Sequence, residues 1–157
     1  MSSLATNSPL SCRHAAGLCV NHHLISTGFN DTYRDVSRHA ECAAIYNYPY
    51  LDKNIYKRVV FNSLNGRIYN VKNSPLRNST IYVMRLYGSR EEDKITKCEY
   101  WGLSSPCNVC LRVMKSYGIK RVIYTTGIPD NPIDIKKIDN IEGYNSVSIR
   151  KILVSRN

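Results

Sequence analysis

The chain has 157 residues, of which 43% are hydrophobic and 22% are charged. This is the balance of one globular domain that can bury a core without disulfides. No apolar run is long enough to cross a bilayer, and the first residues lack the basic-then-apolar order of a secretory signal. We therefore expect a cytoplasmic protein with no membrane partner. A formal net charge of +10 favours phosphate-bearing partners, whether nucleotides or nucleic acid.

The N-terminal part predicts an arm followed by a hairpin. Residues 1–11 are rich in Ser and Asn and are expected to form a flexible arm, with a single domain over residues 12–157. Two short apolar runs, at 13–20 and 24–29, flank the polar Asn21-His22-His23. This pattern predicts a β-hairpin with a three-residue loop.

A first helix is predicted after the polar connection that follows the hairpin. Ser37 is expected to cap this helix, which begins near Arg38 and ends before Pro49. Its alanines suit a helix that packs closely against a sheet.

Residues 50–79 form a basic insertion. We prefer a helix over 52–64 followed by an extended return, and the alternative is a hairpin across Asn65-Gly66. This region is a candidate surface for a polyanion, because Asp52 alone opposes six basic residues: Lys53, Lys57, Arg58, Arg67, Lys72 and Arg77.

The second half of the chain predicts a strand–helix–strand unit. Residues 80–87 and 121–126 are rich in β-branched and aromatic residues and predict strands, which the crossover makes parallel. A charged loop and an extended stretch follow the first strand. Ser105 and Pro106 are expected to open the intervening helix, which ends at Gly118. Residues 130–157 predict a strand or turn and then a helix or strand.

The strongest functional signal joins two distant stretches. His39 and Glu41 form a His-x-Glu pattern, and Pro106, Cys107 and Cys110 form Pro-Cys-x-x-Cys, with 68 positions between His39 and Cys107. Together they match the signature of zinc-dependent nucleobase deaminases. One His and two Cys leave a fourth zinc position open for water, and a carboxylate beside it can carry protons.

Two other interpretations of these residues stay open. Cys42 lies three positions after His39 and could close a structural zinc site as a fourth ligand. Cys107 and Cys110 could alternatively form a redox-active pair. The remaining cysteines are expected to be buried as small apolar residues.

The sequence resembles the cytidine deaminase-like zinc superfamily, and most closely its CMP/dCMP-type branch. The matching stretches occur in family order, at residues 25–30, 39–45, 105–110 and 118–124. The resemblance implies an α/β fold with three α/β/α layers around a mixed sheet of about five strands. It also implies Zn²⁺ as cofactor, bound by His39, Cys107 and Cys110, with Glu41 as the catalytic proton carrier.

The same resemblance implies the substrate contacts. They are assigned to the Ala40 backbone N–H, which would hold the base, to Asn30, which would contact the sugar, and to Ser105 and Pro106. By analogy we also expect a homo-oligomer.

Three functions are compatible with the sequence. The first is a zinc-dependent hydrolase that deaminates a free cytosine nucleoside or nucleotide, a small-molecule substrate. The second is a deaminase that acts on a base within RNA or single-stranded DNA, with the basic residues and some of the twelve tyrosines, Tyr33 first, as contacts. The third is a zinc-stabilised binding module without catalysis.

Overall fold

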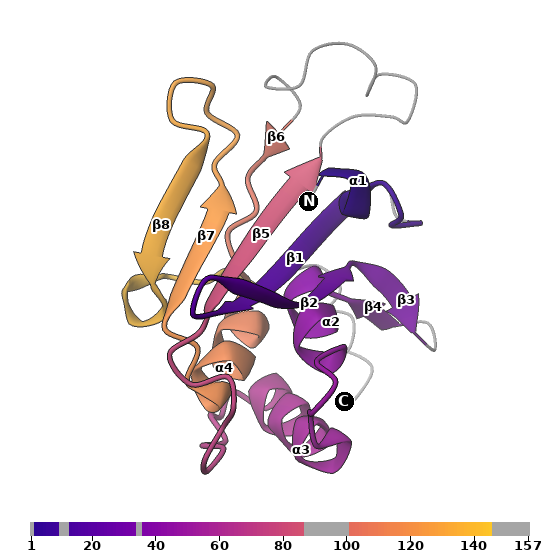
Figure 1. Ribbon diagram of the computed structural model, residues 1–157, viewed down its shortest axis with the longest axis vertical. Helices are drawn as coiled ribbons and strands as arrows, with labels where there is room; N and C mark the ends of the chain where they lie inside the picture. The colour runs from indigo at the N-terminus through magenta and orange to yellow at the C-terminus, as the bar shows by residue number, and fades with distance from the viewer. Residues whose placement is uncertain (1, 10–12, 34–35, 87–100, 146–157) are drawn as a thin grey trace.

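The computed structural model describes residues 2–9, 13–33, 36–86 and 101–145 (Figure 1). The helices are α1 (Ser2–Ala5), α2 (Ala40–Tyr46), α3 (Lys53–Leu64) and α4 (Asn108–Tyr117), with a short 3-10 turn at Ile138–Asn140. The strands are β1 (Arg13–Val20), β2 (His23–Phe29), β3 (Asp31–Tyr33), β4 (Val36–Arg38), β5 (Thr80–Leu86), β6 (Trp101–Gly102), β7 (Arg121–Thr125) and β8 (Ile133–Lys137).

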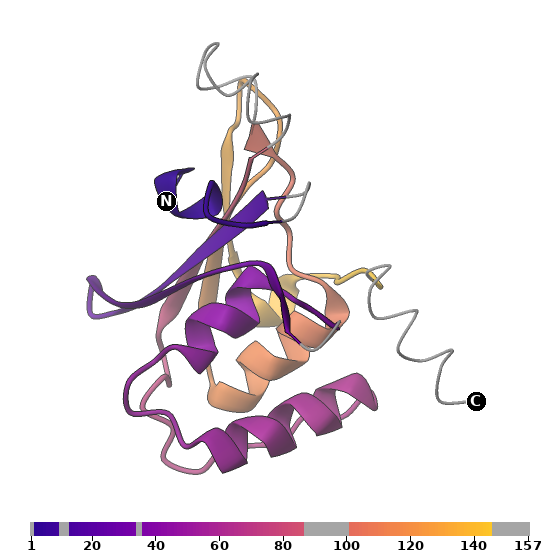
Figure 2. The same cartoon turned by 90° about the vertical axis from the view of Figure 1, so that its right-hand side faces the viewer.

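The centre of the fold is a six-stranded mixed sheet. Its order is β2-β1-β5-β7-β8, and β6 pairs with β5. The β5–β7 pair is parallel and the other pairs are antiparallel. Helices α2 and α4 lie on one side of the sheet and α3 lies beyond them, while α1 lies on the opposite side (Figure 2). The predicted α/β class with a central mixed sheet is confirmed.

Strand β1 separates two apolar layers because alternate side chains point to opposite faces of a strand. Ala16 and Leu18 belong to the main core with the residues of α2 and α4. Ala15 belongs to a second, smaller cluster with Ala5 of α1, and both side chains are fully buried. The N-terminal residues, expected to form an arm, thus include a helical turn that packs on the sheet.

The predicted hairpin of β1 and β2 is confirmed, with a shorter loop than expected. Its turn consists of Asn21 and His22, whose φ angles are 47° and 66°. Two consecutive positive φ values are typical of the two-residue turn whose twist matches that of the flanking strands of a hairpin.

Close packing of α2 on the sheet, expected from its alanines, depends on Gly28 of β2. A Cβ placed on Gly28 would lie 2.3 Å from the backbone N of Ala44 and 2.6 Å from the backbone C of Ala43. Only glycine permits this approach, and it fixes the position of the helix that carries His39.

The basic insertion contains the predicted helix, α3. Asp52 caps it by accepting hydrogen bonds from the backbone N–H groups of Asn54 and Ile55, at 2.8 and 3.1 Å. Asn65 and Gly66 end the helix, with Gly66 at φ +79°, so the alternative hairpin is wrong here. The six basic side chains of the insertion are all exposed.

The strand–helix–strand prediction is also confirmed. Strands β5 and β7 precede and follow α4 in the sequence, and they pair as parallel neighbours in the sheet. Strand β8 then turns back antiparallel to β7. The charged loop predicted at 88–97 and the last twelve residues lie outside the described residues. None of the helices in the described part of the chain is both long and apolar enough to cross a membrane.

Candidate metal centre

Helix α2 begins two residues later than the sequence predicts. Ser37 was expected to cap it, but Ser37 pairs with Thr32 in the β3–β4 hairpin. His39 takes the N-cap position in an extended conformation and makes no side-chain cap hydrogen bond. Backbone pairing in the hairpin therefore overrides the local capping preference and leaves the imidazole available as a ligand.

The same shift occurs at helix α4. Ser105 and Pro106 were expected to open it, yet Cys107 is the N-cap and Asn108 the first helical residue. The preceding backbone is held on the sheet, because Ser104 N–H donates to the Thr125 carbonyl at 2.9 Å and its hydroxyl donates to the Val83 carbonyl at 2.9 Å. Consequently Ser104 is held at the carboxyl end of β7, and the chain leads from there to Cys107 at the start of α4.

Three ligand atoms converge between these two helix starts. The Sγ atoms of Cys107 and Cys110 each lie 3.4 Å from Nδ1 of His39. All three atoms lie within 4.8 Å of one another, and both cysteines are buried. The structure thus brings together the three residues predicted as metal ligands.

The geometry of this cluster fits zinc. Zn–N and Zn–S bonds of about 2.1 and 2.3 Å in a tetrahedron would separate the nitrogen and sulfur ligands by about 3.6 Å. The observed 3.4 Å separations are therefore compatible with zinc without moving either helix. A mixed set of imidazole and thiolate donors also suits zinc better than the harder Mg²⁺ or Ca²⁺.

Cys42 lies beside this cluster but does not complete it. Its Sγ is 3.8 Å from the Sγ of Cys110. Within the described residues, however, the set of mutually close ligand atoms contains only His39, Cys107 and Cys110. A fourth tetrahedral ligand must be close to all three, so this position of Cys42 does not support a closed structural site.

The electrostatics of the metal-free cluster leave Cys107 ionised, whereas His39 and Cys110 keep protons that a bound metal must displace. Hydrogen bonding from the Cys110 thiol and then from His39 lowers the pKa of Cys107 to about 4, although burial opposes this shift. Burial alone would lower the pKa of His39, but the adjacent Cys107 thiolate raises it to about 9. The thiolate of Cys107 in turn raises the pKa of Cys110. Cys107 is thereby already in the anionic form that binds metal.

Glu41 lies in the first turn of α2, buried beside the cluster. Burial raises the pKa of its carboxyl group to about 7, the His39 ring opposes this, and the Cys107 thiolate adds to it. Its own backbone N–H and the Cys110 side chain act in the opposite direction and favour the ionised carboxylate. Its catalytic role stays a prediction.

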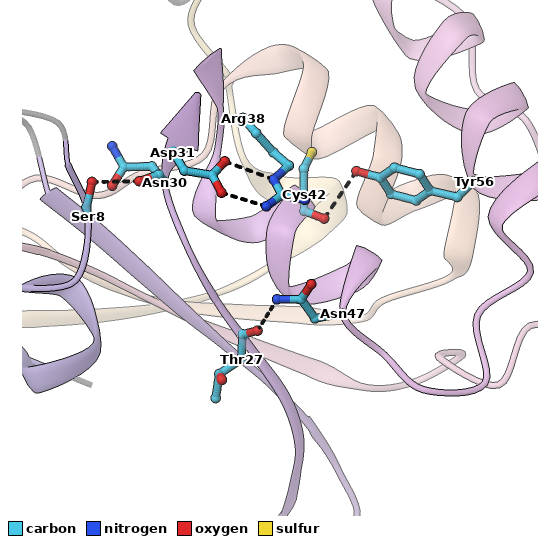
Figure 3. Close-up of polar contacts among 8 residues, drawn as sticks. All are labelled: Ser8, Thr27, Asn30, Asp31, Arg38, Cys42, Asn47 and Tyr56. Carbon is cyan, nitrogen blue, oxygen red and sulfur yellow. Dashed lines mark hydrogen bonds and ion pairs between the residues drawn. The ribbon is translucent and has the colours of Figure 1, made fainter. Parts of the chain in front are cut away.

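Asn30 supports the sheet next to this site. Its Oδ1 accepts the backbone N–H of His14 at 2.6 Å, and its carbonyl accepts the Ser8 hydroxyl at 2.6 Å. Figure 3 shows the Ser8 contact together with a bidentate ion pair in which Arg38 donates to Asp31 at 3.0 and 2.6 Å. This pair fixes the residue that precedes His39. A sugar contact by Asn30 stays a prediction.

The other predicted substrate residues adjoin the metal ligands in the sequence. Ala40 is the fully buried first residue of α2, where backbone N–H groups have no acceptor within the helix. Pro106 is fully buried and Ser105 is half-buried, immediately before Cys107. Their contacts with a substrate stay predictions.

Three further residues beside the site were missed from the sequence. His14 and Arg85 lie opposite each other on β1 and β5, and Tyr144 forms a bridge with Cys107. His14 was assigned only to an apolar run and Arg85 only to a strand. Because side chains alternate between the two faces of a strand, the sequence could have placed His14 and Arg85 on the same sheet face as Ala16. No sequence signal, however, pairs residue 144 with residue 107.

The fold and the site together define a mixed α/β protein with a buried His-Cys-Cys cluster that can hold one metal ion. In structure, the chain is similar to the cytidine deaminase from Burkholderia pseudomallei, with a TM-score of 0.49 and 16% identity over 88% of this chain and 87% of that one. No protein-family model matches the sequence. No curated protein matches it either.

Proposed function

We propose that this protein is a zinc-dependent hydrolase that deaminates a cytosine-containing nucleoside or nucleotide, giving the uracil form and ammonia. One observation carries the proposal. His39, Cys107 and Cys110 converge at two helix starts, with the buried carboxyl group of Glu41 beside them and Cys42 outside the ligand set. Three protein ligands and an open fourth position are typical of catalytic rather than structural zinc.

His39, Cys107 and Cys110 would hold the metal. When bound, zinc would supply a Lewis acid that makes a water molecule acidic near neutral pH. The chain's own residues account for the proton transfers. Glu41 can carry one proton of the attacking water to the ring nitrogen, and then carry the second, from the newly added hydroxyl group, to the departing amino group.

The overall reaction balances with water as the only co-substrate. A C–O bond forms at the carbon that carries the amino group, the C–N bond breaks, and ammonia leaves. No oxidant or reductant is required, so a redox role for Cys107 and Cys110 is unnecessary. The backbone N–H of Ala40, in the first turn of α2, would hold the base beside Glu41.

Free substrates are the first choice, and a base within a nucleic-acid strand is the second. The six exposed basic residues of the 50–79 insertion favour the second candidate, since phosphate contacts dominate nonspecific nucleic-acid binding. They lie on and after α3, which packs outside α2 and α4 (Figures 1 and 2).

The test is ammonia release from cytidine, CMP, dCMP, adenosine and short single-stranded oligonucleotides by zinc-loaded protein. We expect turnover of at least one free cytosine substrate, lost when a chelator removes the metal. Activity on oligonucleotides alone would transfer the assignment to strand editing, and no activity on any of them would overturn the proposal.

A variant pair then separates catalysis from metal binding. Glu41→Gln should lower kcat by about 10²- to 10⁴-fold and retain one zinc per chain. Asp130→Asn, which changes an exposed carboxylate in the loop before β8, is the matched control and should remain active. Unchanged turnover in Glu41→Gln would contradict the assigned role of Glu41.

A further inference from the structure

A segment near residue 144 is seated directly on the metal centre. The backbone N–H of Asn108, the first residue of α4, donates to the carbonyl of Tyr144 at 2.9 Å. Cys107 and Tyr144 form a parallel bridge. The side-chain amide of Asn108 also donates to Oδ1 of Asn145 at 3.0 Å. The chain after β8 therefore returns to the helix start that carries two of the three metal ligands.

Gly143 makes this seating possible. A Cβ at this position would lie 2.3 Å from Oδ1 of Asn108, 2.7 Å from a methyl group of Leu111 and 2.9 Å from the backbone N of Asn108. A backbone atom cannot yield as a flexible side chain can. Any larger residue at 143 must lift the segment away from α4.

The side chain of Tyr144 lies near the reactive groups. Its hydroxyl lies within electrostatic reach of Glu41, Cys107, Cys110 and Arg85. Half of its surface nevertheless remains exposed. An aromatic side chain that lies near the proton carrier and is half exposed offers a face on which a planar ring can stack.

We propose that Tyr144 is a substrate-binding residue whose ring stacks on the heterocycle, while Glu41 transfers protons at the edge of the heterocycle that reacts. This inference rests on the function proposed above and adds a contact that neither motif predicted. The segment formed by Gly143, Tyr144 and Asn145 then completes the site at the start of α4, and Tyr144 contributes to the choice of heterocycle.

Steady-state kinetics of two variants test the role of the ring. Removing a base-stacking aromatic side chain weakens binding by about 10- to 100-fold, so Tyr144→Ala should raise KM by this factor and change kcat much less. Tyr144→Phe keeps the ring and should stay within about threefold of wild type. Zinc content should be one per chain in both. Tyr50→Ala is the matched control, because Tyr50 is 84% exposed in the loop before α3.

Each opposing result overturns the inference. An unchanged KM in Tyr144→Ala would exclude a substrate contact. Equal losses in Tyr144→Phe and Tyr144→Ala would exclude stacking by the ring. Loss of zinc in either variant would make the residue a support of the metal centre instead.

A measurement without turnover tests the seating of the segment. In Gly143→Ala the Asn108 amide should exchange with solvent faster than in wild type, because its acceptor on Tyr144 is displaced. Unchanged exchange would contradict the seating. A wild-type protein that turns over no substrate defeats the proposed function itself, whereas an active wild type with an unaltered Tyr144→Ala variant defeats only this inference.

Discussion

His14 makes the stability of this fold depend on pH in a direction that can be worked out. The ring is largely buried on β1, opposite Arg85, and its Nε2 has no hydrogen-bond partner among the described residues. Burial, followed by the positive charges of Arg85 and His39, lowers its pKa from 6.5 to about 4. The neutral imidazole is therefore the form that the folded protein tolerates.

The sign and size of the effect follow from linkage. Between pH 4 and 6.5 the unfolded chain binds a proton at His14 that the folded chain does not, so stability increases with pH in this window. The contribution of His14 is complete above about pH 6.5 and is lost as the pH falls towards about 4. At about 1.4 kcal/mol for each pKa unit, the shift corresponds to at most about 3 kcal/mol.

Urea unfolding of the metal-free protein and of His14→Gln, between pH 4 and 8, measures this contribution. Metal-free protein is required because zinc binding is itself pH-dependent. The free energy of unfolding of wild type relative to His14→Gln should be constant above pH 7 and should fall by up to about 3 kcal/mol towards pH 4.

His22→Gln, which removes an exposed histidine from the β1–β2 turn, controls for the mere loss of one imidazole. Parallel curves for wild type and His14→Gln across the whole range would refute the reasoning. A difference that grows in favour of wild type as the pH falls would refute it as well.

Three other experiments test how the site is held. Cys42→Ala should retain one zinc per chain, whereas Cys110→Ala should lose it. Metal analysis after dialysis measures the zinc content of both variants. A zinc-free Cys42→Ala protein would show that Cys42 is a ligand. Gly28→Ala must push α2 outward, since its Cβ would be 2.3 Å from the helix backbone. Urea unfolding should show that the free energy of unfolding falls by about 1–3 kcal/mol. Competition with a chelator should show weaker zinc binding. Asn30→Ala leaves a buried N–H without its acceptor and should cost about 1–3 kcal/mol. The exposed Asn47, which donates to the Thr27 carbonyl at 2.9 Å (Figure 3), should matter less, and equal losses at both positions would contradict a special role for Asn30.

The ligand set itself could be read from the sequence. The spacing of Cys107 and Cys110 places both sulfurs at one helix start, because residues three apart share a face of a helix. The β5–α4–β7 crossover and the helix of the basic insertion were also predictable. In each case short-range periodicity and turn residues specify the element.

The positions of the helix starts were not predictable in this way. Serine is a favoured N-cap residue, so Ser37 and Ser105 are expected caps. The backbone near both, however, is hydrogen-bonded to neighbouring strands. Hydrogen bonds to residues distant in the sequence thus decided where α2 and α4 begin, and placed His39 and Cys107 at the N-caps.

The surroundings of the cluster depended on tertiary structure even more. By itself the sequence determined the chemistry, namely one histidine, two thiols and a carboxylate in a pattern suited to a metal-dependent hydrolase. Only the packed fold decided that Cys42 lies outside the ligand set and that Tyr144 lies against Cys107. Residue types and local spacing carry reactivity, whereas distances between segments that are far apart in the chain exist only once the sheet has aligned them.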